Sequence, residues 1–244
     1  MNSTAPLTPQ SPQAGDGAPG PRLFLDSADR SEWAALLPSG LFYGVTTNPT
    51  ILAAANLGCT LPTLAQLVRD ALARGVTEIQ VQSWGSSAAR LTENGLALAR
   101  LSPRLVVKVP ITFDGIQAVA SLHSAGVRTT LTAVYSAHQA LTAAAAGAAY
   151  VAPYHGRIGD LGRDGLAEIG AMRRILANTA SPTRLLVASI RSPADLAALA
   201  ASGADTFTIS PKVARALFDD PDTIAAASQF EATAAGATPA GGQA

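Results

Sequence analysis

The sequence of 244 residues has little of several features that mark large classes of protein. Its single cysteine, Cys59, excludes an intramolecular disulfide framework and favours a reducing compartment. The 17 basic and 17 acidic residues cancel, so charge gives no reason to expect binding to nucleic acid or to an anionic membrane surface. No apolar run approaches the ~20 residues that cross a bilayer, and residues 1–20 do not resemble a signal peptide. We therefore expect a soluble, cytoplasmic protein that binds neither nucleic acid nor membrane.

Lysine is almost absent. Among the 17 basic residues only Lys108 and Lys212 are lysines, and the others are arginines. Lys108 stands inside the apolar run LVVKVP at 105–110, whereas Lys212 follows Ser210 and Pro211, where a surface helix could start. Arginine can replace lysine in many surface contacts, but it stays protonated and cannot act as an amine nucleophile. The position of Lys108 therefore suggests a chemical role.

The chain divides into two tails and one domain. Residues 1–20 and 236–244 are mostly Pro, Gly, Ser, Thr and Ala, which predicts a disordered N-terminal tail and a flexible C-terminal tail around a domain at 21–235. Within the domain, short apolar runs alternate with helical patterns. The predicted strands are 23–26, 43–46, 78–82, 105–109, 129–134, 150–153, 185–189 and 206–209. The predicted helices are 31–37, 61–74, 87–100, 115–124, 137–146, 166–179, 193–201 and 213–218, with a further helix at about 224–234.

Eight strands in strict alternation with eight helices predict an α/β fold, a single (β/α)8 TIM barrel with an extra C-terminal helix. An open, flavodoxin-like sheet is the alternative. Such a sheet usually has fewer strands, and no Gly-x-Gly-x-x-Gly follows the first strand here.

Polar residues gather where the predicted strands end, which is where the active sites of such barrels lie. Seven of the eight strands contribute to this set: Asp26, Thr46, Asn48, Gln80, Gln82, Lys108, Thr130, Thr132, Tyr154, Arg157, Ser189 and Arg191. Structural roles remain open for most of them. Asp26 and Ser189 could cap helices, Asn48 before Pro49 has the pattern of an N-cap, and the isolated arginines Arg157 and Arg191 could be solvated. Buried Gln80, Thr130 and Thr132 could simply fill the barrel.

A lysine between Val107 and Val109 must lose most of its hydration, find a carboxylate or become neutral. A structural ion pair with Asp26 is one interpretation. The other is an amine whose pKa burial lowers, so that its neutral form can attack a carbonyl. His123, His138 and His155 are scattered without ligand spacing, so we expect no metal site and no metal cofactor.

Several strand-end motifs, in the same order, resemble the transaldolase family over about residues 22–235. They are Leu25-Asp26-Ser27, GVTTNPTI at 44–51, LVVKVP at 105–110, Thr132-Ala133-Val134-Tyr135, VAPY with Arg157 and Ile158 at 151–158, and Ala188-Ser189-Ile190-Arg191. Two positions resemble the small fructose-6-phosphate aldolases within that family: Gln80 replaces the Glu and Tyr154 the Phe typical of true transaldolases. The segment 156–162 departs from the aldolase pattern.

The resemblance implies roles for individual residues. Lys108 would form a Schiff base with the substrate, without any cofactor. Asp26 and Tyr154 would be the candidates for the proton transfer at the substrate's C4 hydroxyl, with a water held by Gln80 and Thr132. The substrate-binding residues would be Thr46 and Asn48 for the hydroxyls of the ketone unit and Arg157, Ser189 and Arg191 for the phosphate.

The implied activity is aldol cleavage and formation of ketose phosphates such as fructose 6-phosphate. Two alternatives stay open. One is a true transaldolase of the pentose phosphate pathway, and the other is a barrel that binds sugar phosphates without Schiff-base chemistry. The helix at about 224–234 follows a barrel that is already complete, so it could pack on a neighbouring subunit. The resemblance accordingly implies a ring-like homo-oligomer, with a decamer as the candidate assembly.

Overall fold

The computed structural model describes residues 20–236. Eight parallel strands close into a barrel in the order β1 to β8, because β1 pairs with both β2 and β8. This confirms the predicted (β/α)8 barrel, and the open sheet was the wrong alternative. The strands are β1 Arg22–Asp26, β2 Gly44–Thr46, β3 Glu78–Gln82, β4 Leu105–Pro110, β5 Thr129–Val134, β6 Tyr150–Pro153, β7 Arg184–Ile190 and β8 Thr206–Ile209. The tails predicted at 1–20 and 236–244 lie outside the described residues, apart from Gly20 and Gly236.

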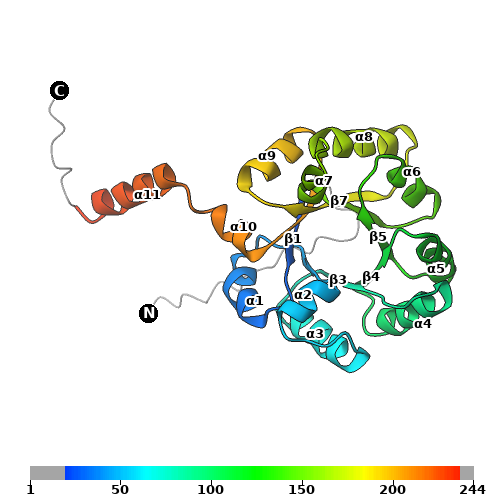
Figure 1. Cartoon of the computed structure of the whole chain (residues 1–244). Coiled ribbons are helices and arrows are strands. Elements are labelled where there is room, and N and C mark those ends of the chain that lie inside the picture. Colours follow the sequence, from blue (N-terminus) through cyan, green and yellow to red (C-terminus); the bar gives the residue numbers. More distant parts are fainter. Residues whose placement is uncertain (1–19, 237–244) are drawn as a thin grey trace, which may run out of the picture.

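Helices surround the barrel and connect successive strands (Figure 1). They are α1 Arg30–Leu36, α2 Pro49–Ala54, α3 Leu61–Ala73, α4 Ala88–Ala99, α5 Phe113–Ser124, α6 His138–Ala145, α7 His155–Asp160, α8 Gly165–Asn178, α9 Pro193–Ala201, α10 Pro211–Ala216 and α11 Pro221–Ala234, with a 3-10 turn at Leu37–Ser39. All nine predicted helices are present. Two short ones, α2 and α7, were not predicted, and both follow strand ends that carry candidate site residues. Among residues 20–236, no helix combines the length and apolar composition needed to cross a bilayer.

The side chains of each strand alternate between two buried surfaces, the interior of the barrel and the layer of helices around it. The side chains of Val107 and Val109 belong to the main apolar core, where the outer face of the barrel meets the helices. Phe24, Val106 and Tyr150 belong to a second, smaller apolar cluster with Ala152 and Leu186. Since Lys108 lies between Val107 and Val109 on β4, its side chain shares the inner face with Val106.

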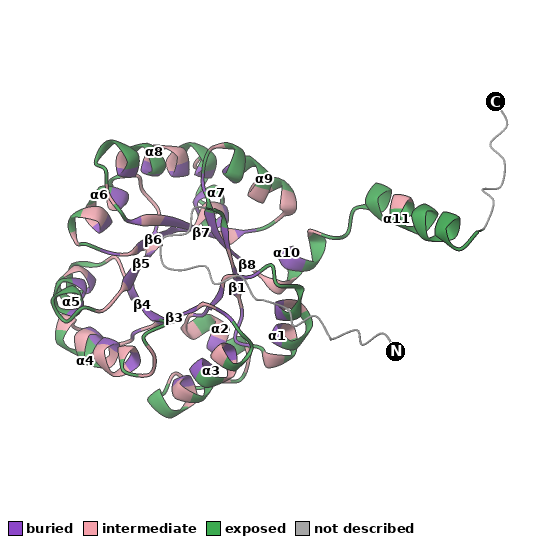
Figure 2. Ribbon diagram, turned by 180° about the vertical axis from the view of Figure 1, so that it is seen from behind, coloured by how far each residue is buried: buried purple, intermediate pink, exposed green. Residues whose placement is uncertain are grey.

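The helix α11 stands apart from the barrel (Figure 1). None of its residues is buried, and Figure 2 shows it exposed along almost its whole length while the strands are mostly buried. Ile224 is 50% and Phe230 is 70% exposed. A helix that buries nothing has no packing energy within its own subunit to stabilise it.

Candidate active site

Lys108 lies inside the barrel on β4, beside Gln82 of β3 and Thr130 of β5 in the strand register. Its side chain is only 4% exposed. Burial lowers the pKa of the Lys108 amine, because the charged form loses hydration, and the negative charge of Asp26 opposes this shift. Among the described residues, Lys108 has neither a hydrogen-bond partner nor an ion-pair partner within 4.0 Å. The direct Lys108–Asp26 ion pair is therefore not formed, although the two charges interact across the barrel.

Asp26 ends β1 and is still partly accessible to solvent. Desolvation raises the pKa of its carboxyl group, while Lys108, the hydroxyl of Thr46 and Arg157 act in the opposite direction. Thr46 Oγ1 donates a hydrogen bond of 2.6 Å to Asp26 Oδ1. The capping interpretation of Asp26 is wrong, because Asp29 caps α1 and accepts from the Ser31 N–H.

The opposite shifts of Lys108 and Asp26 have one electrostatic cause. Each group loses hydration in its charged form, and each would regain part of that loss if the other stayed charged. Together they bring the proton affinities of the amine and the carboxylate closer. Two titratable groups whose pKa values are shifted in this way inside a barrel mark a candidate site for proton transfer.

Thr46 carries a second contact that the sequence analysis missed. Its Oγ1 lies 2.5 Å from Thr208 Oγ1 of β8, and since Thr46 gives its proton to Asp26, Thr208 is the donor of this pair. The alternation of Thr206 and Thr208 with Phe207 and Ile209 could have indicated that the threonines face inward.

Asn48 follows β2 and is the N-cap of α2, with Pro49 at the first helical position. Its Oδ1 accepts from the Ile51 N–H at 3.0 Å, which confirms the capping interpretation. Within residues 20–236 its amide nitrogen has no partner. The cap thus fixes the oxygen and leaves an N–H donor for a ligand.

Gln80 and Thr132 belong to separate pairs. The side chain of Gln80 is fully buried, accepts from Thr130 Oγ1 at 2.8 Å and donates to Glu78 Oε1 at 2.9 Å. Thr132 Oγ1 lies 2.9 Å from the hydroxyl of Tyr154. Gln80 and Thr130 do fill the barrel, as the structural interpretation expected, but they do so through polar contacts. The contact between Gln80 and Glu78 was not anticipated.

Tyr154 follows β6 and is held from two further sides. The ring of Tyr135 meets it edge to face, with 5.6 Å between centroids, and the Arg157 guanidinium lies 4.7 Å from its ring centre. Arg157 is exposed in α7, one of the two short helices that were not predicted. Its contact with the aromatic ring fixes a cation at the rim of the site.

Arg191 follows β7 and is paired as well as exposed. Its Nη1 donates to Asp160 Oδ1 at 2.7 Å, and its Nη2 donates to the other carboxylate oxygen. The Arg191 guanidinium lowers the pKa of Asp160 and is the largest cause of that shift. An anion bound by Arg191 would share this guanidinium with Asp160 or displace the Asp160 carboxylate, a competition that the sequence does not indicate.

Two bulges shape the strand ends near these residues. The pairing of β5 with β6 shifts between Leu131 and Val134, and Ala133 has φ of 59°. The pairing of β7 with β8 shifts likewise between Val187 and Ile190, and Ser189 has φ of 59°. The extra residue at each bulge bends the strand and changes the direction in which the side chains at its end point. Ser189 caps no helix, since Ser192 caps α9, so the capping interpretation of Ser189 is wrong.

Gly156 allows α7 to lie close to β7. A Cβ atom at this position would come within 2.5 Å of the Ser189 carbonyl oxygen and 2.6 Å of Arg191 Nε. We expect Gly156→Ala to lower the free energy of unfolding by about 1–3 kcal/mol and to displace Arg191. Gly159→Ala, in the same helix, is the matched control, since a Cβ there has no neighbour within 4 Å. Urea unfolding of both variants tests this, and equal stabilities would contradict it.

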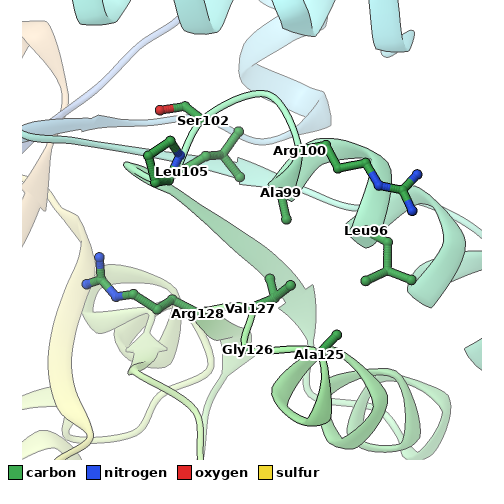
Figure 3. Close-up of a pocket in the computed structure, with 10 residues that line it drawn as sticks. Leu96, Ala99, Arg100, Ser102, Leu105, Ala125, Gly126, Val127 and Arg128 are labelled. Atoms are coloured by element: carbon green, nitrogen blue, oxygen red, sulfur yellow. The ribbon is translucent and has the colours of Figure 1, made fainter.

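Lys212 lies outside the cluster of polar residues at the carboxyl ends of the strands. It is exposed in the first turn of α10, as expected of a helix start. A pocket of about 480 Å³ lies between α4 and α5 at the amino-terminal ends of β4 and β5, the end of the barrel opposite the cluster (Figure 3). Its two arginines, Arg100 and Arg128, point away from each other there and do not form an anion-binding pair.

Within residues 20–236, no three His, Cys, Asp or Glu side chains are grouped so that they could hold a metal ion.

Comparison with known proteins shows one consistent family. A model of the family described as transaldolase/fructose-6-phosphate aldolase matches residues 23–240. A "probable transaldolase" of Phenylobacterium zucineum is 37% identical over 211 residues, which are 86% of this chain and 94% of the relative. Proteins of the same name from Carboxydothermus hydrogenoformans and Maricaulis maris are 35% identical over 203 residues and 38% identical over 198 residues. These alignments cover 82% and 80% of this chain, and 92% and 88% of the relatives.

Proposed function

Because the chain belongs to the transaldolase/fructose-6-phosphate aldolase family, we propose that this enzyme is a class I aldolase acting through a Schiff base on Lys108. It would cleave ketose phosphates such as fructose 6-phosphate to dihydroxyacetone and glyceraldehyde 3-phosphate, and run the reverse reaction. The observation that carries the proposal is a buried lysine amine of lowered pKa on the inner face of β4, across the barrel from a carboxylate.

The first step forms the imine. The neutral amine of Lys108 adds to the C2 carbonyl of the ketose, and loss of water from the carbinolamine leaves a protonated imine. Burial supports this step because it increases the fraction of neutral amine near neutral pH. The positively charged imine then draws electron density from the neighbouring carbon, which a carbonyl does less well.

The second step breaks the C3–C4 bond. A base takes the proton from the C4 hydroxyl, the C4–O bond becomes the aldehyde carbonyl, and the C3–C4 electron pair moves into the imine to give an enamine. Asp26 and Tyr154 are the two candidates for this base. We favour Asp26, because its raised pKa makes it a stronger base than an ordinary carboxylate and because Thr46 fixes its orientation.

The third step releases the ketone. Protonation of the enamine at C3 regenerates an imine, to which water adds before the C–N bond breaks and Lys108 is freed. Gln80 and Thr132, the latter beside the Tyr154 hydroxyl, are proposed to hold this water. An amide and a phenol near the imine favour hydrolysis, whereas transfer requires that water stays away until an acceptor aldehyde arrives.

Substrate binding would use the remaining residues of the cluster. Thr46 and the free amide nitrogen of Asn48 would bind the hydroxyls of the three-carbon ketone unit. Arg157, Ser189 and Arg191 would bind the phosphate, a group that guanidinium binds with two parallel hydrogen bonds. Asp160 would have to release Arg191 in part when the phosphate arrives.

A true transaldolase is the second candidate, favoured by the name of the relatives. The two functions differ in what happens to the enamine, so fructose 6-phosphate should be supplied without any acceptor. The aldolase proposal expects continuous formation of glyceraldehyde 3-phosphate. Absence of that product, together with turnover once an acceptor aldehyde is added, would reject the aldolase in favour of the transferase.

A barrel that only binds sugar phosphates is the third possibility. Borohydride reduces an imine to a stable secondary amine, so treatment in the presence of fructose 6-phosphate should leave the reduced ketose or the reduced three-carbon ketone, each lighter than the free ketone by one oxygen, on the peptide that contains Lys108. No adduct at saturating substrate would rule out the Schiff base.

The pH dependence of kcat/KM tests the activation of the amine. Only neutral Lys108 attacks the carbonyl, and burial lowers its pKa from the ordinary value of 10.5. The value of kcat/KM should therefore rise with pH as the ammonium loses its proton, and it should level off below pH 10.5. A profile that keeps rising through 10.5 would mean that burial does not activate this amine.

We also propose that α11 packs against another copy of the chain in a ring-like homo-oligomer. The exposed side chains of Ile224 and Phe230 on α11, and of Phe218 just before it, support this, because a helix of this kind gains stability only when a partner covers it. Light scattering should give a mass several times the 24.7 kDa of one chain. A monomeric mass would contradict the proposal.

A further inference from the structure

Both ends of the Gln80 side-chain amide are hydrogen-bonded inside the barrel. Thr130 Oγ1 donates to its Oε1 at 2.8 Å, and its Nε2 donates to Glu78 Oε1 at 2.9 Å. Thr130 and Gln80 are fully buried and Glu78 is 1% exposed, so bulk water does not compete for these contacts. One Nε2–H and one lone pair of Oε1 remain for a molecule in the site.

The carboxyl group of Glu78 is surrounded by hydrogen-bond donors. Its second oxygen, Oε2, accepts from Arg128 Nη2 at 2.7 Å and from the Tyr150 hydroxyl at 3.2 Å, while Arg22 donates to that hydroxyl at 2.8 Å. Within residues 20–236, the side chains that hydrogen-bond to the two carboxyl oxygens are those of Arg128, Tyr150 and Gln80, and each can donate. Burial is the largest influence on the pKa of Glu78 and raises it, while the Arg128 charge and the hydrogen bonds from Gln80, Arg128 and Tyr150 act in the opposite direction. The 2.7 Å ion pair with Arg128 Nη2 and the hydrogen bond from Tyr150 fit an ionised carboxylate.

An ionised carboxylate can only accept hydrogen bonds. The end of the Gln80 amide that faces Glu78 must therefore be its NH₂ group, and the oxygen must face Thr130. A neutral partner at position 78, such as an amide, could donate or accept and would permit either orientation of Gln80. The charge of Glu78 thus selects one of two otherwise similar rotamers.

We propose that Glu78 is a positioning residue that fixes which way the Gln80 amide faces, with Thr130 as its counterpart on the other side. The inference rests on the proposed function, in which Gln80 holds the water that hydrolyses the imine. With the amide fixed, the remaining N–H and lone pair have defined directions, and the water they hold is oriented for release of the ketone. Glu78 touches no reacting atom and acts only through Gln80.

Two reactions separate this role from general stability. Release of dihydroxyacetone needs the water, because the imine must be hydrolysed. The first turnover of glyceraldehyde 3-phosphate, measured as a burst after enzyme and fructose 6-phosphate are mixed, needs imine formation and cleavage of the C3–C4 bond but no hydrolysis of an imine. A misoriented Gln80 should therefore slow release and spare this burst, whereas a loosened barrel would slow both.

The test uses three isosteric changes. Glu78→Gln removes the charge, Thr130→Val removes the donor on the other side, and Thr206→Val is the matched control. Thr206 is an equally buried inward threonine, bonded to Arg184 and Asp205 and not to Gln80. We expect the first two variants to lower kcat for release about 10-fold, with kcat/KM and the rate of the burst close to those of the wild type.

Thr206→Val should leave both reactions unchanged, and Thr130→Ser, which keeps the hydroxyl, should restore release. If Glu78→Gln fails to fold, the comparison of Thr130→Val with Thr206→Val decides alone. Release at the wild-type rate in folded Glu78→Gln or Thr130→Val, or an equal loss in the rates of release and of the burst, would overturn the inference. Failure of the proposed function looks different: the wild type itself would then give no borohydride adduct.

Discussion

Lys108→Met is expected to abolish both turnover and the borohydride adduct, with kcat reduced by about 10⁴-fold or more. No other side chain near the site can replace the amine, because the nearby cations Arg157 and Arg191 are guanidinium groups that stay protonated. Methionine has a similar length and no charge, so it also removes the cost of burying an ammonium. The variant should remain folded, and circular dichroism checks this.

The chain offers a matched control for this variant. Lys212 is the only other lysine, and it is exposed at the start of α10. Lys212→Met should therefore retain activity and the adduct, and peptide mass spectrometry should find the reduced ketose at position 108 alone. Full activity of folded Lys108→Met would require that the Schiff-base mechanism be abandoned.

Most of the fold was predictable from the sequence because a closed parallel barrel imposes a simple pattern on it. In β4, Leu105, Val107 and Val109 pack outward with the helices while Val106 and Lys108 face inward, so the alternation alone placed the lysine. The long helices also begin at residues that cap well. Ser87 before α4 and Thr112 before α5 each accept from a backbone N–H in the first turn.

The two short helices at the rim were harder to predict. In α2, the cap Asn48 and the first residue Pro49 were recognised, but six residues give too little periodicity to indicate a helix. In α7 there is no side-chain cap at all, and the helix is fixed instead by the close approach of Gly156 to β7. That contact joins residues distant in sequence, so no local pattern reports it.

The detailed geometry of the site depends on contacts of the same kind. Ser189 was predicted as a site residue, but its left-handed backbone and the bulge in β7 follow from pairing with β8. Glu78 opens β3 and looks like a solvated strand end, whereas the barrel closes around it with Arg128 and Tyr150. The alternation of residues along a strand predicts which face a side chain lies on. Its contacts across the barrel form only when the eight strands close, so no local pattern predicts them.

Asp26→Asn is the second change for which we expect a large effect. Asparagine keeps the shape and can still pair with Thr46, but it cannot take the proton from the C4 hydroxyl, so kcat should fall by about 10²–10⁴-fold. The substitution also removes the negative charge that opposes the effect of burial on Lys108. The pKa of the amine should therefore fall further, and the rise of kcat/KM should move to lower pH.

Three comparisons make this result decisive. Asp29→Asn is the matched control, because Asp29 lies three residues further along as the exposed cap of α1 and asparagine caps equally well. The borohydride adduct should still form in Asp26→Asn, since imine formation needs the amine and not this base.

Tyr154→Phe removes the hydroxyl of the other candidate for the base at the C4 hydroxyl. A larger loss of kcat in Tyr154→Phe than in Asp26→Asn would assign the proton transfer to the phenol, and Asp26 would then act only through its charge on Lys108.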